Sequence, residues 1–124
     1  MYRRASIAIF LVFASFSAGA ANISIEDRDL SALPRDVESA LRSDVEFKDG
    51  ECQLIGKRID LDGDGRSTDF FVTTANVCSW GAAEGPIWVL RASRAGYVMV
   101  LSSGGYGLTL RKVKRNGLRR LNVY

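Results

Sequence analysis

The chain of 124 residues contains no histidine and only two cysteines. Without histidine, nothing completes a zinc site around the cysteines, and no imidazole base can activate a thiolate or hydroxyl. Acid–base catalysis would have to come from an aspartate cluster, or from a lysine or tyrosine with a shifted pKa. We find no nucleophile and base that the sequence itself would bring together, and we therefore expect a protein that is not an enzyme.

Acidic residues are almost missing from the second half of the chain. From Asn22 to Asp69 there are 13 acidic and 7 basic residues, whereas from Phe70 to Tyr124 Glu84 is the only acid beside 8 basic residues. The charge is therefore segregated along the sequence. Six of the basic residues gather near the C-terminus: Arg111, Lys112, Lys114, Arg115, Arg119 and Arg120.

One long uncharged stretch stands at the N-terminus, from Ala5 to Ala18, and follows two arginines. It is too short for a membrane-spanning helix, which needs about 20 apolar residues. Ala18-Gly19-Ala20 offers the small side chains that a signal peptidase reads. We predict that residues 1–20 are a cleaved signal peptide and that residues 21–124 form a single small domain, periplasmic or secreted.

The two cysteines both lie in this predicted mature part. The residue directly after the cleavage site is alanine and not cysteine, so we expect no lipid anchor and no stable membrane insertion after processing. An exported chain meets an oxidising environment, in which Cys52 and Cys78 would persist as a disulfide. In the chain-entropy picture, such a bridge stabilises the fold by about 3 kcal/mol.

One helix and several strands are indicated by the apolar spacing. Leu33, Val37, Ala40 and Leu41 recur at helical spacing up to about Ser43, and Pro34 suits a first turn. The later segments have strand character. They are Cys52 to Leu61, Phe70 to Thr74, Ile87 to Ala92, Tyr97 to Leu101, Leu108 to Arg115 and Leu118 to Tyr124.

The last two of these segments are joined by Asn116-Gly117, the dipeptide best suited to a two-residue type I′ turn. That turn predicts that Leu110 faces Val123 and that Lys112 faces Leu121. Successive hairpins favour an antiparallel meander of about five strands. With the N-terminal helix packed on the apolar face of this sheet and one disulfide, we predict an α+β fold.

The segment Asp60-Leu61-Asp62-Gly63-Asp64-Gly65 has aspartates at alternate positions and glycine where a sharp turn needs it. Calcium takes six to eight oxygen ligands, so we assign Asp60, Asp62, Asp64, the Arg66 carbonyl and Asp69 as candidate ligands. An EF-hand is excluded because its last ligand position holds Phe71. The alternative is a structural turn, in which aspartates bond their own backbone and neighbouring bases neutralise them.

This segment resembles the DLNGDG-type loops of integrin-like blade repeats and of small exported bacterial proteins. The resemblance implies a cation-binding loop between two strands, closed by a later aspartate. Here Asp69 comes one residue later than in the blade repeats, and the motif occurs once, so no propeller is implied.

Two loops are candidates for a partner-binding surface. Trp80 lies in the Gly/Pro-rich segment Ser79 to Trp88, which follows Cys78. The alternative is that Trp80 and Trp88 belong to the core. The second loop, Ser102 to Gly107, surrounds Tyr106 with glycines that would make it flexible.

Ser103-Gly104-Gly105-Tyr106 is similar to the SGxY motif of some periplasmic lysozyme inhibitors. That similarity implies that Ser103, Gly104 and Tyr106 would enter the active cleft of a target enzyme; the alternative is a plain hairpin connection.

The basic hairpin is the third candidate surface, with Arg115 and Arg119 near its turn. Basic side chains either protect a solvated hairpin from edge pairing or steer the protein toward an anionic partner. Nucleic acid is not expected, because the chain is exported and carries no recognised binding motif.

These observations favour a periplasmic, non-catalytic binding protein. We expect it to inhibit a cell-wall-degrading enzyme, as an immunity protein against an amidase or as a lysozyme inhibitor. The alternative function is a calcium-binding structural or adhesive module of the envelope, with calcium as its only cofactor. We expect a protein partner, an enzyme that acts on the envelope, and we leave homodimer formation open beside it.

Overall fold

The computed structural model describes residues 20–44, 52–75 and 84–124. The predicted signal peptide, apart from Ala20, lies outside these residues, as do Cys78 and Trp80. The α+β class is confirmed, since one helix accompanies antiparallel strands. The elements are β1 (Ala21–Ser24), β2 (Ser31–Ala32), α1 (Arg35–Asp44), β3 (Leu54–Ile59), β4 (Asp69–Thr74), β5 (Gly85–Ser93), β6 (Gly96–Gly105), β7 (Gly107–Arg115) and β8 (Leu118–Val123).

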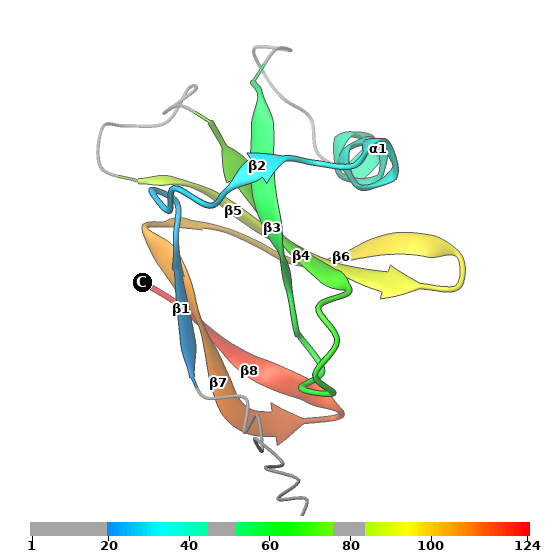
Figure 1. Cartoon of the computed structure of the whole chain (residues 1–124), viewed down its shortest axis with the longest axis vertical. Helices are drawn as coiled ribbons and strands as arrows, with labels where there is room; N and C mark the ends of the chain where they lie inside the picture. Colours follow the sequence, from blue (N-terminus) through cyan, green and yellow to red (C-terminus); the bar gives the residue numbers. More distant parts are fainter. Residues whose placement is uncertain (1–19, 45–51, 76–83) are drawn as a thin grey trace, which may run out of the picture.

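The strands form two sheets, so the prediction of a single meander is wrong. One sheet has five strands in the order β2-β3-β4-β5-β6, and the other has three in the order β1-β7-β8. The chain passes from the first sheet to the second at Tyr106, which alone separates β6 from β7. In Figure 1, α1 and the three-stranded sheet lie on opposite sides of the five-stranded sheet.

The space between the two sheets is filled by one apolar cluster. Phe71, Ile87 and Val89 of the larger sheet meet Leu108 and Leu110 of β7, together with Ile23, Ile59 and Leu61. Because side chains alternate along a strand, the neighbours of these residues point to the opposite face. The central strand β4 is therefore buried at every position.

The opposite face of the larger sheet packs on α1 through a second cluster. Val37 and Leu41 of the helix contact Phe70, Val72, Trp88 and Leu90, with Leu54 beside them. The predicted helix is confirmed within two residues at its start and one at its end. No helix in the described part of the chain has the length and apolar character needed to cross a membrane.

The hairpin of β7 and β8 turns where the sequence predicts. Asn116 and Gly117 have φ angles of 54° and 80°, as a type I′ turn requires. The predicted register holds at the turn, where Lys114 faces Arg119, but it shifts further along. Leu110 faces Leu121 instead of Val123, because an irregularity between Leu110 and Lys114 leaves extra residues on β7.

Candidate functional site

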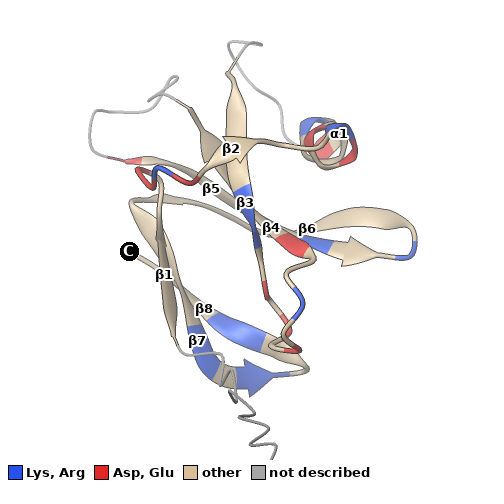
Figure 2. Ribbon diagram, in the orientation of Figure 1, with Lys and Arg blue, Asp and Glu red and all other residues tan. Residues whose placement is uncertain are grey.

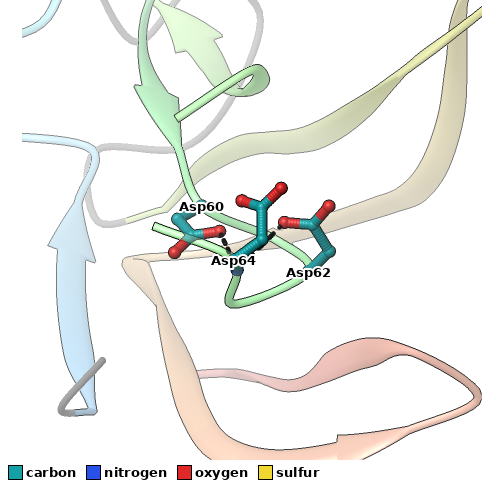
Figure 3. A group of neighbouring side chains, drawn as sticks. All are labelled: Asp60, Asp62 and Asp64. Atoms are coloured by element: carbon teal, nitrogen blue, oxygen red, sulfur yellow. Dashed lines mark hydrogen bonds between the residues drawn. The ribbon is translucent and has the colours of Figure 1, made fainter. Parts of the chain in front are cut away.

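The acidic loop, residues Asp60 to Gly65, connects β3 to β4 and gathers three carboxylates. One oxygen from each of Asp60, Asp62 and Asp64 lies within 4.8 Å of the others, and Figure 3 shows the three side chains around the loop. Gly63 and Gly65 have φ angles of 72° and 85°, so both need the freedom of glycine. The clustering predicted from the alternating aspartates is therefore present.

The same carboxylates are engaged by the loop backbone. Asp60 accepts hydrogen bonds from the N–H groups of Gly63 at 2.9 Å, Asp64 at 3.2 Å and Gly65 at 3.0 Å. Asp64 accepts one from the Arg66 N–H at 2.8 Å. These bonds are those of a structural turn, and they leave fewer carboxylate lone pairs for a cation.

The second and third aspartates of the loop, Asp62 and Asp64, differ in their electrostatics. Desolvation, with hydrogen bonds shared with Asp60 and Asp64, raises the pKa of Asp62 above its usual value. The backbone N–H of Arg66 lowers the pKa of Asp64, because it bonds to the charged form. A bound cation would lower the pKa of Asp62, since an opposite charge favours the ionised carboxylate.

Two of the predicted calcium ligands have other roles. Asp69 is buried in β4, and its carboxylate accepts a hydrogen bond from the Ala92 N–H at 2.9 Å. It is not part of the three-carboxylate cluster in the described residues. The Arg66 carbonyl accepts the Thr68 N–H at 3.1 Å. This hydrogen bond of Asp69 joins β4 to β5, while its assignment as the closing calcium ligand stays a prediction.

The acidic loop rests on the basic hairpin, a contact that sequence reasoning missed. The Arg119 N–H donates to the Leu61 carbonyl at 2.8 Å, and its guanidinium reaches the Asp60 carbonyl at 3.4 Å. The Lys114 side chain lies over Gly63, so closely that an added Cβ there would be 2.6 Å from it. Figure 2 shows the acidic loop beside the basic end of β7 and β8.

Arg119 is an internal residue, which corrects its assignment to a partner-binding surface. Only 6% of it is exposed, and its guanidinium also donates to the carbonyls of Arg111 at 2.8 Å and Leu110 at 3.0 Å. Arg119 therefore adds no side chain to the exposed basic surface of the hairpin. Arg115, by contrast, is exposed at the turn, as predicted.

The predicted loop at Ser102 to Gly107 is a strand end followed by a sharp corner. Ser103 and Gly104 pair with Ile87 and Pro86 inside the larger sheet, which corrects the prediction of a flexible loop. The glycines allow close packing: a Cβ on Gly105 would lie 2.7 Å from the Tyr124 carbonyl oxygen, and one on Gly107 would lie 2.5 Å from that of Ile23.

Tyr106 forms the corner itself and presents its side chain to solvent. Its N–H donates to the Tyr124 carbonyl at 2.6 Å, and its carbonyl accepts the Ile25 N–H at 2.9 Å. Tyr106 and Tyr124 are 47% and 52% exposed. Hydrogen bonds from Ile25 and to Tyr124 thus fix the backbone that carries the exposed phenol.

The remaining predicted residues divide between core and undescribed segments. Trp88 is buried in the cluster under α1, so the core interpretation of this tryptophan is confirmed. Cys52 is buried and is not a free thiol. Its predicted partner Cys78, like Trp80, lies outside the described residues, so the disulfide between them stays a prediction.

Comparisons of the chain with protein-family models, with curated proteins and with solved structures found no match.

Proposed function

We propose that this chain is an exported, non-catalytic binding protein that inhibits a cell-wall-degrading enzyme, either a lysozyme or an amidase. The observation that carries the proposal is the corner at Tyr106. Tyrosine supplies a large contact area with few rotatable bonds, and so it is favoured in binding surfaces. A phenol on a backbone fixed at both its N–H and its carbonyl also loses little entropy on binding.

The neighbourhood of the corner supports the same use. Tyr124 adds a second exposed ring, and its carbonyl fixes the N–H of Tyr106. Ser103 and Gly104, the other residues of the SGxY similarity, belong to the rigid end of β6. A preshaped projection of this kind suits entry into the concave site of an enzyme, because it needs no rearrangement.

The test is inhibition of purified enzymes. A panel of lysozymes and peptidoglycan amidases would be assayed for wall hydrolysis with increasing amounts of the processed protein. Tyr106→Ala should weaken the inhibition about 30-fold or more, as expected for a central aromatic contact. Val98→Ala, which removes another exposed apolar side chain from β6, is the matched control and should leave inhibition unchanged.

The three clustered carboxylates favour a second candidate function, a calcium-dependent envelope module. If calcium binds the native loop selectively, it raises the melting temperature with increasing concentration. Asp62→Ala or Asp64→Ala should abolish that rise. A melting temperature independent of calcium removes this candidate and leaves the loop as a structural turn supported by Lys114 and Arg119.

A further inference from the structure

The end of the β7–β8 hairpin extends beyond the folded core. β7 is largely buried up to Leu110, and every residue from Arg111 to Arg115 is exposed. Pairing with β1 ends at Leu110, where β1 begins with Ala21. We call the exposed residues Arg111, Lys112, Val113, Lys114, Arg115 and Arg120 the hairpin tip.

The charge of the hairpin tip is largely uncompensated within the described residues. Lys114 lies against the acidic loop, but Arg111, Lys112, Arg115 and Arg120 take part in none of the ion pairs there. Those pairs join Arg42 to Glu38, and Lys57 to Asp27 and Asp29. The tip therefore presents a local excess of positive charge to solvent, which favours an anionic partner.

An apolar side chain lies among these bases. Val113 is 55% exposed, the most exposed large apolar side chain in the described residues. A partner that offers only negative charge would bind no more tightly because of Val113. The surface of a bilayer offers headgroup phosphates for the bases and an apolar region for a short aliphatic side chain.

The strand order places this tip where the chain enters the fold. Ala21 pairs with Leu110, one residue before the basic run, and the uncharged stretch Ala5 to Ala18 ends shortly before Ala21 in the sequence. β1 therefore begins beside the point where β7 leaves the core and the hairpin tip starts.

We propose that the hairpin tip docks reversibly on anionic phospholipid headgroups, with Val113 at the level of the headgroups. The bases supply an attraction that salt weakens, and the valine supplies a part that salt does not. This inference is independent of enzyme inhibition, because it uses the opposite end of β7 from Tyr106.

The experiment is co-sedimentation of the exported, processed protein with vesicles. Phosphatidylcholine vesicles containing roughly one-quarter phosphatidylglycerol are compared with pure phosphatidylcholine, at low and at high salt. We expect binding to the anionic vesicles alone, weaker at high salt. Lys112→Gln with Arg115→Gln should weaken this binding about 30-fold, given the usual contribution of each basic residue.

The matched control is Arg91→Gln with Arg94→Gln, which removes the same charge from the exposed end of the β5–β6 hairpin. It should bind as the parent does, whereas Val113→Ser should bind more weakly at both salt concentrations. Equal loss in the control pair would overturn the proposal. So would retention on soluble polyphosphate without measurable binding to anionic vesicles, which would assign the tip to soluble polyanions.

Discussion

Arg119 holds the acidic loop and the C-terminal hairpin together through bonds that a guanidinium can make in several directions at once. Its donors reach the carbonyls of Asp60, Leu110 and Arg111 from a site that is almost closed to water. Lysine would keep the charge but could not reach all three carbonyls. A buried carbonyl that loses its donor costs about 1–3 kcal/mol.

Arg119→Lys should therefore lower the free energy of unfolding by about 2–4 kcal/mol in urea denaturation. Arg120→Lys is the control, because that neighbour is exposed, and it should change stability by less than about 0.5 kcal/mol. Equal and small changes in the two variants would show that the observed hydrogen bonds contribute little.

Asp62 and Asp64 should titrate in a fixed order in the native protein. The pKa of Asp62 is raised, chiefly by desolvation, and that of Asp64 is lowered, chiefly by the Arg66 N–H. Asp62 therefore opposes folding at neutral pH, and this effect fades as the pH falls through its raised pKa. Asp64 stabilises the native state above its usual pKa, and this contribution is lost as the pH falls through its lowered pKa.

Carboxyl chemical shifts followed through an acid titration would measure both pKa values. At neutral pH, Asp64→Asn should lower the melting temperature, while Asp62→Asn should leave it unchanged or raise it. The reverse order of titration would contradict the hydrogen-bond pattern of the loop.

At the scale of elements, the junction of β6 and β7 depends on the absence of side chains. Gly107→Ala places a methyl group against the Ile23 carbonyl oxygen and the Tyr124 ring. The Ile23 side of this contact is backbone, which cannot turn away, so we expect a loss of about 1–3 kcal/mol.

Ser102→Ala, at an exposed position of β6, serves as the control and should have little effect. Thermal melting of the two variants measures the difference. If Gly107→Ala has the same melting temperature as the parent, the backbone at the corner can move to accommodate a methyl group. The argument that Tyr106 is held on a rigid backbone would then fail.

The sequence predicted the elements whose causes are local. Helical spacing located α1, and Asn116-Gly117 located the last turn, since both depend on neighbouring residues. The shift of register between Leu110 and Lys114 was missed, because an irregularity in β7 does not follow from the turn type alone. β1 and β2 were also missed, being only four and two residues long.

The candidate site was predicted in the same uneven way. Alternating aspartates bring their own carboxylates together, so the cluster could be foreseen. The burial of Asp69 and Arg119 could not, because it depends on β5 and on the acidic loop, which are distant in sequence. The glycines around Tyr106 were assigned to flexibility because the close approach of Ile23 and Tyr124 is a tertiary contact.

At the scale of the whole molecule, the five-stranded sheet is covered on both faces, by α1 and by the smaller sheet. The uninterrupted apolar runs Phe70-Phe71-Val72 and Ile87 to Leu90 are the signal of this burial, because a strand with one wet face would alternate. We predicted that only the helix would cover the sheet, and we therefore missed the three-stranded sheet on its other face.

The helix layer makes its own prediction. Leu41 is fully buried between α1 and the sheet, so Leu41→Ala should cost about 2–5 kcal/mol of unfolding free energy. Ser39→Ala, on the exposed side of α1, is the control. A loss below about 1 kcal/mol in Leu41→Ala would mean that α1 is not an integral layer of the fold.

The central claim is that the protein acts by binding, through a fixed aromatic corner, and that its own side chains transform no substrate. The most direct measurement is wall hydrolysis by purified lysozymes and amidases, with the processed protein added and with the protein alone in a chelator. We predict saturable inhibition of at least one enzyme and no hydrolysis by the protein alone. Hydrolysis by the chelated protein itself would contradict the account.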